Sequence, residues 1–490
     1  MDQHQQYTGL NQQFINGQWQ QGTSSRLTDN INPYTQAVLH QFQCASQQDV
    51  DAAYQAAKAA QKAWENTSPA EKMGLIQKLA NVVATRGEEI IDWIIQESGS
   101  TRLKASIELG AAQGIIREAE TFPLRVNGEI LPTSVPDQQS RIYRKALGVI
   151  GVISPWNFPF HLSMRSVITA LALGNTVVLK PASDTPVTGG TLLAKLFEEA
   201  GFPAGVLNVV AGAGSEIGDY FVEHAVPSLI SFTGSTEVGK RVGQLAVGGR
   251  YIKRIALELG GNAPMVVLDD ADLAQAVDLT VMGRFLHQGQ ICMSTNRVIV
   301  DAKVYDQFVD LLVQKVHSLS MGDPNEMGTL IGPIINQSQV RNIERIIAEA
   351  KAAGIEMRVG GETQGNIIPP HVFINVDPQS ALAREESFGP VLPVIKAQDE
   401  AHALALANDT EYGLSSAVCT ANHERGVQFA LGIEAGMTHI NDITVDDQPH
   451  APFGGEKNSG LGRFNGHWII EEFTRTHWVT VQTKPKAYPV

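Results

Sequence analysis

The 490-residue sequence has only three cysteines, Cys44, Cys292 and Cys419. An odd number of widely spaced cysteines argues against a disulfide framework, and no Cys-x-x-Cys pair is present to bind a metal. No run of ~18 uninterrupted apolar residues occurs, so no membrane span is predicted. The N-terminal stretch MDQHQQYTGL lacks the basic and apolar segments of a secretory signal. These absences favour a protein of the reducing cytoplasm.

Basic charge is also scarce. The formal net charge is −14 at pH 7, and no basic stripe is present. This balance argues against nucleic acid or an anionic membrane as a partner. Hydrophobic residues make up 43% of the chain, which is enough for large cores. At roughly 100–200 residues per domain, the length predicts two to four domains.

Short apolar segments alternate with helical segments from residue 147 onward. The segments LGVIGVI, NTVVLK, VLNVV and LISFT predict strands of βαβ units, and therefore a parallel sheet with both faces covered. Ligands bind such sheets at the carboxyl ends of the strands. Asn157, Lys180 and Ser235 are expected at these ends. A second α/β region is predicted from LELGGNAPMVVL to about residue 440.

Two features nearer the ends of the chain also have clear signatures. FINGQW (Phe14–Trp19) predicts a hairpin around Asn16-Gly17, and Ser46 is expected to cap a helix. The tail THWVTVQTKPKAYPV is β-branched and aromatic. We expect it to form a strand that pairs with another part of the protein, for example another subunit.

Several single residues admit two interpretations each. The GSTEVG turn (234–239) suits a phosphate at a helix N-terminus, or its glycines only shape a turn. Lys180 binds a ligand or is a solvated strand-end lysine. Glu258, within IALELGG, is a buried general base or an ordinary strand glutamate. Cys292, within HQGQICMST, is a nucleophile or a small buried side chain. His287 lies five residues earlier, in an expected helix, and either shapes a substrate channel or ends that helix.

Taken together, the motifs resemble the aldehyde dehydrogenase superfamily over nearly the whole chain. The matching segments are, in order, PWNFP (155–159), KPAS (180–183), FTGSTEVG (232–239), LELGGNAP (257–264), GQICMS (289–294), EESFGPV (385–391) and PFGGEKNSG (452–460). The resemblance implies an α/β fold with two Rossmann-like parallel-sheet domains and a small β element for oligomerisation. The implied domains are NAD(P)-binding (1–122 and 147–258), catalytic (259–440), oligomerisation strands (123–146 and 471–490), and a loop region returning to the cofactor domain (441–470).

The resemblance also implies roles for individual residues. Cys292 corresponds to the nucleophile, Asn157 to the oxyanion donor and Glu258 to the general base. No metal is expected. The implied cofactor-binding residues are Ile153, Trp156, Lys180, Ser183, Gly234, Ser235, Glu386 and Phe388. Among them, Glu386 would hold the nicotinamide ribose, Ser235 the pyrophosphate and Lys180 the adenosine ribose.

The implied chemistry accounts for these residue types. A Cys292 thiolate adds to an aldehyde carbon, donors stabilise the new oxyanion, and hydride leaves to give a thioester. Glu258 then activates water, and its presence favours hydrolysis over transfer to coenzyme A. Ser183 stands where many NAD-specific members have glutamate. NAD use with NADP tolerated is therefore expected, unless Ser183 still binds the ribose and selectivity for NAD remains.

The segments WNFPFHLSMRSV and KPASDTP are most similar to the branch acting on benzaldehyde, salicylaldehyde and vanillin. Phe158, His161 and Arg165 are expected along the aldehyde channel, with Phe158 stacking on a ring and Arg165 meeting a phenolic oxygen. Each could instead pack within a helix. The alternatives are an aliphatic or semialdehyde dehydrogenase and, from other classes, a catalytically silent scaffold or a thiol esterase. A small-molecule aldehyde is the expected partner, in a homodimer or homotetramer.

Overall fold

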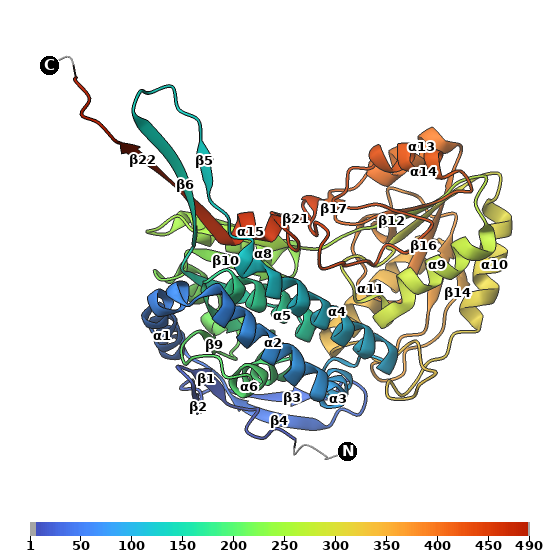
Figure 1. Ribbon diagram of the computed structural model, residues 1–490. Helices are drawn as coiled ribbons and strands as arrows, with labels where there is room; N and C mark the ends of the chain where they lie inside the picture. Colours follow the sequence, from blue (N-terminus) through green and yellow to red (C-terminus); the bar gives the residue numbers. More distant parts are fainter. Residues whose placement is uncertain (1–5, 489–490) are drawn as a thin grey trace.

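The computed structural model describes residues 6–488. Two large α/β units lie side by side, and a narrow β arm projects from the first (Figure 1). Within the described residues, the sheets of the two units have eight and seven strands, and the arm has three. Two short antiparallel pairs complete the strands: β3 (Leu27–Ile31) with β4 (Val38–Gln43), and β17 (Tyr412–Gly413) with β20 (Glu456–Lys457).

The first sheet has a parallel centre, with an antiparallel hairpin at one edge and a single antiparallel strand at the other. Its order is β2-β1-β9-β8-β7-β10-β11-β21. The hairpin predicted around Asn16-Gly17 is confirmed, and both turn residues have positive φ, 51° and 73°. The strands are β1 (Gln13–Ile15), β2 (Gln18–Gln20), β7 (Val149–Ile153), β8 (Thr176–Lys180), β9 (Leu207–Val209), β10 (Leu229–Thr233), β11 (Arg254–Glu258) and β21 (Gly460–Leu461).

Alternation of side chains along the strands builds an apolar layer on each face. Val177 and Leu179 join the core on one face, whereas Val178 between them joins the core on the other. The first layer contains α2 (Pro69–Thr85), α3 (Gly87–Ser98), α4 (Arg102–Thr121), α5 (Pro159–Ala172) and α6 (Leu192–Glu199). The second contains α1 (Gln47–Asn66), α7 (Asp219–Glu223) and α8 (Thr236–Gly248). The cap predicted at Ser46 is confirmed, as a capping box with Asp49.

The strand order creates a crevice at one place in the first sheet. The five parallel strands are arranged so that the chain order changes direction between β7 and β10. Ligands in doubly wound sheets bind beyond the carboxyl ends of the strands at such a switch point. Pro155–Asn157 follow β7, and Gly234–Ser235 follow β10. The fold therefore brings the PWN and TGS motifs to the two sides of one crevice.

The second sheet is covered in the same way. Its order is β14-β15-β16-β13-β12-β18-β19. One face packs on α9 (Leu273–Phe285) and α10 (Tyr305–His317), and the other on α11 (Gln337–Ala352), α12 (Ala381–Arg384), α13 (Glu400–Asn408) and α14 (His423–Leu431). The strands are β12 (Pro264–Val267), β13 (Arg297–Asp301), β14 (Glu356–Val359), β15 (His371–Ile374), β16 (Val391–Ala397), β18 (Ala417–Cys419) and β19 (His439–Ile440).

The arm consists of β5 (Glu129–Leu131), β6 (Gln138–Ala146) and β22 (Thr474–Gln482). The predicted tail strand does form, but its partner is β6 of the same chain. The strand is shorter than the expected 471–490 because α15 (Trp468–Phe473) occupies the residues before it. The arm carries exposed apolar side chains, including Ile130 at 85% and Trp478 at 65% exposure. The domain boundaries drawn from the sequence stay a prediction.

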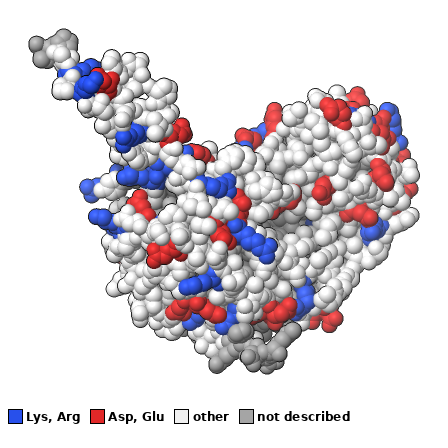
Figure 2. Space-filling model, in the orientation of Figure 1, with Lys and Arg blue, Asp and Glu red and all other residues white. Residues whose placement is uncertain are grey.

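Two surface features bear on partners. On the face shown in Figure 2, acidic and basic side chains of the described residues are interspersed, with no continuous basic stripe. Among residues 6–488, no helix combines the length and the apolar character that crossing a bilayer would require.

Candidate active site

The three cysteines occupy different environments, and only one lies beside large cavities. Cys419, in β18, is buried against the sulfur of Met265 at 3.6 Å, and burial raises the pKa of its thiol to about 12. Cys44 is buried and lies 3.2 Å from the Thr28 hydroxyl. Cys292 is partly exposed, in the loop between α9 and β13. The geometry therefore separates Cys292 from the other two.

The loop before Cys292 is not the helix expected from the sequence. His287 and Gln288 have φ values of 51° and 57°, and Gly289 has a φ of 76°. Consecutive left-handed residues cannot continue an α-helix, so the expectation of a helix at His287 is wrong. Gln288 anchors this unusual turn by donating to the Pro333 carbonyl at 2.8 Å. Backbone strain of this kind is concentrated at functional sites.

Cys292 lies where two cavities meet. Asn157, Leu162 and Cys292 line both of them. Gly261 makes the close packing of this region possible, because a Cβ there would lie 2.3 Å from the Cys292 carbonyl oxygen. We call the cavity on the β7/β10 side the nucleotide-side cavity and the other the substrate-side cavity.

The nucleotide-side cavity has a volume of about 270 Å³. It occupies the switch-point crevice and is lined mainly by residues following β7, β10 and β11, together with the 386–388 segment. Ser235 is the N-cap residue of α8, and its side chain makes no capping hydrogen bond. The residues that line the nucleotide-side cavity are Pro155, Trp156, Asn157, Leu162, Thr233, Gly234, Ser235, Leu259, Gly260, Cys292, Gln339, Asn342, Glu386 and Phe388.

Two residues of this wall have unusual conformations or charges. Phe388 has a φ of 46°, which is rare for a bulky residue, and its ring meets Trp156 edge-on at 5.3 Å. Glu386 accepts a hydrogen bond from the Gly261 N–H at 3.0 Å. Burial raises the pKa of the Glu386 carboxyl to about 7, against the opposing effects of that hydrogen bond and of Arg284. Gly260 leaves the carboxylate room, because a Cβ there would lie 2.5 Å from it.

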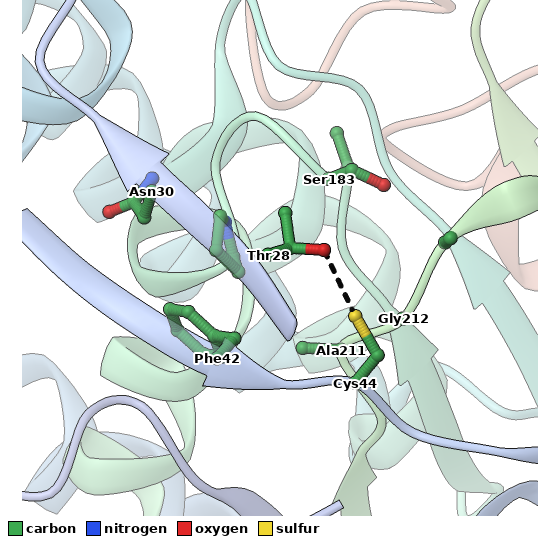
Figure 3. Close-up of a pocket in the computed structure, with 10 residues that line it drawn as sticks. Thr28, Asn30, Phe42, Cys44, Ser183, Ala211 and Gly212 are labelled. Carbon is green, nitrogen blue, oxygen red and sulfur yellow. Dashed lines mark hydrogen bonds between the residues drawn. The ribbon is translucent and has the colours of Figure 1, made fainter. Parts of the chain in front are cut away.

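Lys180 and Ser183 lie outside the lining of this cavity. Lys180 is 5% exposed, and burial lowers its pKa to about 8, so it is not a solvated strand-end lysine. Its Nζ makes one long hydrogen bond of 3.4 Å, to the Pro181 carbonyl. Ser183 is exposed and borders a separate small pocket of about 20 Å³ (Figure 3). A pocket of this volume has room for about one water molecule and is too small for a nucleotide base.

Ile153 also lies apart from the cavity lining. It is the last residue of β7, and its side chain packs against the apolar layers formed with α1, α7 and α8.

The Asn157 side chain is held toward the Cys292 loop. Its amide nitrogen donates to the Gln290 carbonyl at 2.9 Å, which leaves the second N–H of the amide for another acceptor. Its backbone carbonyl accepts from Lys104 Nζ at 2.6 Å. Lys104 pairs with Glu108 at 2.5 Å, and both are fully buried. This ion pair fixes the start of α5, because Glu108 also accepts from two backbone N–H groups there.

Glu258 ends β11 with one carboxylate oxygen paired and the other without a partner. Its Oε2 accepts from Arg165 at 2.5 Å, whereas Oε1 is buried and has no hydrogen bond within the described residues. Burial raises the pKa of the Glu258 carboxyl, and Arg165 opposes that rise. A surface-facing strand glutamate is therefore excluded, since the residue is 2% exposed.

The Cys292 thiol responds to the same surroundings. Burial raises its pKa well above the ordinary value, the negative charges of Glu258 and Glu386 add to the rise, and Arg165 opposes it.

His287 is not a base suited to take the proton of the Cys292 thiol. Burial and the Lys104 charge lower the pKa of His287 well below its usual range, and its ring packs edge-on against Phe158 at 5.9 Å. It shapes the region without being a strong base.

The substrate-side cavity has a volume of about 230 Å³ and largely apolar walls. Phe158 and His161 line it, but Arg165 does not. Residues within 443–447 and residues shortly before Cys292 supply much of the wall. The lining residues are Ile107, Ala111, Asn157, Phe158, His161, Leu162, Glu258, Met282, Leu286, Ile291, Cys292, Met293, Ile443, Val445, Asp446, Asp447 and Phe453.

Arg165 lies behind this wall, and its position does not support the expected contact with a phenolic oxygen. Its guanidinium is between the rings of Phe453 and Phe464, with centroid distances of 4.7 Å and 4.5 Å. It binds Glu258 on one side and Asp447, at 3.2 Å, on the other. The buried guanidinium is therefore already bound by two carboxylates.

Sequence reasoning missed several residues of this region. Asp447 binds both Arg165 and His161, and Arg284 ties the Cys292 loop to the 387–389 segment. Lys104 and Glu108 were also missed, although their i,i+4 spacing is a usable signal for a helical ion pair. Among residues 6–488, no group of three or more His, Cys, Asp or Glu side chains is arranged to hold a metal ion.

Comparison with known proteins identifies the family. The sequence profile described as "Aldehyde dehydrogenase family" matches residues 19–479. The chain therefore belongs to the aldehyde dehydrogenase family. It is 56% identical over 468 residues to a vanillin dehydrogenase of Corynebacterium glutamicum, covering 96% of this chain and 97% of that protein. It is 50% identical to a benzaldehyde dehydrogenase of Bacillus subtilis, covering 99% of each.

Solved structures agree with this assignment. The crystal structure of an NAD-dependent benzaldehyde dehydrogenase from Corynebacterium glutamicum aligns with a TM-score of 0.90 at 52% identity, covering 98% of each chain. The structure of a salicylaldehyde dehydrogenase from Pseudomonas putida G7, complexed with salicylaldehyde, aligns with a TM-score of 0.95 at 36% identity. It covers 98% of this chain and 99% of that one. The predicted family and α/β fold are confirmed.

Proposed function

We propose that this protein oxidises aromatic aldehydes to carboxylic acids, with NAD as the hydride acceptor and a thioester at Cys292 as the intermediate. The observation that carries the proposal is the position of Cys292, where the nucleotide-side and substrate-side cavities meet. A sulfur at this junction can bind a substrate carbon on one side while hydride leaves toward the other. The names of the relatives support an aromatic substrate.

The residues around Cys292 suit each step. The Cys292 thiol first loses its proton to solvent, and the thiolate then adds to the aldehyde carbon. The new oxyanion is stabilised by the free N–H of the Asn157 amide and the Cys292 backbone N–H. Departure of hydride leaves a thioester on sulfur. Glu258 Oε1 then accepts a proton from water as the water attacks the thioester, and the acid leaves with restoration of the thiolate.

The residues present fit a dinucleotide. Its pyrophosphate would lie at the N-terminus of α8, where the Ser235 side chain makes no capping hydrogen bond and Gly234 lines the cavity. Glu386 would hold the nicotinamide ribose, with Phe388 and Trp156 against the nicotinamide. The chemistry supplied by bound NAD is acceptance of hydride from the substrate carbon.

The adenosine end depends on two further residues. Lys180, buried with one long hydrogen bond, has donor capacity left for ribose hydroxyls. Ser183 brings no negative charge to the place where a 2′-phosphate would lie. We therefore include NADP as a tolerated, secondary cofactor.

An aromatic substrate also suits the walls of the substrate-side cavity. Phe158 offers a ring for stacking, and Leu162, Ile291 and Val445 give an apolar enclosure. Such a cavity favours a flat apolar ring over the charged end of a semialdehyde. The aliphatic dehydrogenase remains the competing proposal for the same chemistry.

The test is an aldehyde panel followed by the absorbance of the reduced cofactor. We expect kcat/KM with NAD for benzaldehyde, salicylaldehyde or vanillin to exceed that for hexanal and succinic semialdehyde by at least about tenfold, roughly 1.4 kcal/mol. Preference for hexanal would favour the aliphatic alternative. If the folded protein turns over no aldehyde, the dehydrogenase proposal is wrong. Hydrolysis of activated esters would then favour the thiol esterase, and no activity at all would favour the silent scaffold.

We further propose a homodimer or homotetramer assembled through the arm, in a reducing cytoplasm. The exposed Ile130 and Trp478 side chains and the open strand edges of the arm support assembly. The arm would then form the oligomerisation element of the domain division given above. Light scattering tests it, and a monomer at micromolar concentration would refute it.

A further inference from the structure

Asp447 holds one histidine of the substrate-side cavity in a fixed orientation. Its Oδ2 lies 2.9 Å from His161 Nε2 and 3.2 Å from Arg165 Nη1. Its Oδ1 accepts from the Asn465 amide at 2.6 Å. Burial alone would raise the pKa of the Asp447 carboxyl, but the hydrogen bond from His161 and the charge of Arg165 outweigh it and hold the pKa at about 2. Asp447 is therefore a carboxylate that only accepts hydrogen bonds.

This contact determines what the other nitrogen of the His161 ring can do. Because Asp447 only accepts, His161 Nε2 carries the proton and donates. In a neutral imidazole the remaining nitrogen, Nδ1, is then an acceptor. His161 is 3% exposed, and its Nδ1 is buried with no hydrogen-bond partner within the described residues. A buried acceptor without a partner has an unused capacity that a bound ligand can satisfy.

The other polar groups of the cavity have different tasks or partners. Asn157 and Glu258 act in the proposed reaction. Asp446 accepts from Gln448 at 2.8 Å. Most of the remaining wall is apolar, and among its polar side chains His161 is the one with a buried nitrogen that lacks a partner within the described residues.

We propose that His161 Nδ1 accepts a hydrogen bond from a hydroxyl group on the aromatic ring, so that hydroxybenzaldehydes are preferred over rings without a donor. This inference rests on the proposed function. Asp447 acts through His161 as a positioning residue, and His161 itself is specificity-determining. Recognition by an acceptor distinguishes a hydroxyl from groups of similar size that cannot donate.

The test compares the ortho, meta and para hydroxybenzaldehydes with the matching fluorobenzaldehydes, which have no donor. Every comparison is run at one fixed pH. For at least one isomer we expect the hydroxy-to-fluoro ratio of kcat/KM to be roughly three- to tenfold higher in the unaltered protein than in His161→Phe. Comparing one pair in both proteins cancels the intrinsic reactivity of the two aldehydes.

Two further variants serve as a conservative replacement and as a control. His161→Gln keeps a donor and an acceptor and should restore part of the ratio. Ile107→Val changes the apolar wall of the same cavity and should alter both aldehydes of a pair alike. Equal ratios in His161→Phe and the unaltered protein, for all three isomers, would overturn the inference.

Other outcomes are also decisive. Should His161→Phe fail to fold, the unaltered protein decides, with a hydroxy-to-fluoro ratio above about three for one isomer in support. A ratio below about three for every isomer would count against the inference. Turnover of benzaldehyde without any hydroxyl preference defeats only this inference, whereas absence of turnover with every aromatic aldehyde defeats the proposed function.

Discussion

The two cavities that meet at Cys292 are built on different principles. The nucleotide-side cavity is lined largely by residues in the turns that follow β7, β10 and β11, which the sheet topology brings together. The substrate-side cavity takes its wall from α4, α5 and the 443–453 segment, and a buried charge cluster supports it. The first is specified by the fold and the second by particular side chains. Substitutions should therefore affect cofactor and substrate sides separately, except at the shared residues.

Cys292 belongs to both cavities, so its replacement should have the largest effect. Cys292→Ala removes the nucleophile, and kcat should fall by at least roughly 10⁴-fold, because covalent catalysis is lost altogether. Binding of NAD, followed by quenching of protein fluorescence, should persist, since the nucleotide-side walls remain. Cys419→Ala is the matched control and should keep activity, because Cys419 lies in β18 against Met265. Residual turnover above a tenth in the Cys292 variant would refute its role.

Glu258 belongs to the substrate-side cavity alone, and its replacement should separate the two halves of the reaction. Glu258→Gln removes the base, and general base catalysis contributes typically 10²–10⁴-fold, so steady-state kcat should fall by roughly that factor. Hydride transfer should survive. The protein should then release a burst of about one reduced cofactor per active site and retain the acyl group.

The acyl group on Cys292 is measurable as added mass by mass spectrometry. A slow steady state with no burst and no added mass would show that Glu258 acts before the thioester forms. That outcome would contradict the assignment of Glu258 to hydrolysis.

The contrast between the cavities also explains how far the sequence could be used. Strand segments such as NTVVLK and the motifs PWN, TGS and LELGG predicted the first sheet and its crevice, because local hydrophobic patterns and glycine positions encode them. The Cys292 loop was different. Its left-handed residues His287 and Gln288 carry no local signal, because tertiary contacts such as Gln288 to Pro333 stabilise them.

The substrate side was the harder part for the same reason. Arg165, His161 and Asp447 are separated by up to 286 positions, and nothing in a single sequence shows that one carboxylate binds both basic side chains. Arg165 was expected along the channel from its place in the WNFPFHLSMRSV segment alone. The structure instead places it between two phenylalanine rings, where Glu258 and Asp447 neutralise it.

Arg165 offers a way to test this cluster through pH. Arg165 opposes the rise of the Glu258 pKa caused by burial, so Arg165→Met should raise that pKa further. Glu258 acts as a base only when deprotonated, so the acidic limb of the kcat profile should move to higher pH. Below the new midpoint, kcat should fall in proportion to the loss of the deprotonated carboxylate. Arg165→Lys keeps the charge and should restore part of the profile, whereas an unmoved limb in Arg165→Met would show that Arg165 only packs.

The smallest expected effect is at Ser183, which is exposed and borders a small pocket outside the nucleotide-side cavity. Ser183→Glu introduces a negative charge at the proposed place of the 2′-phosphate, and unit charges 4 Å apart in water repel by about 1 kcal/mol, or about fivefold in binding. We expect kcat/KM for NADP to fall by about that factor while kcat/KM for NAD holds or rises. Ser183→Gln, of the same size without the charge, should leave the ratio of the two cofactors near its starting value. Because Ser183 is remote from the substrate-side cavity, the order of preference among aldehydes should not change. A changed order would show that this position is coupled to the substrate-side cavity. Equal losses of kcat/KM for NAD and NADP in both variants would show that the size of the side chain, not its charge, matters at this position.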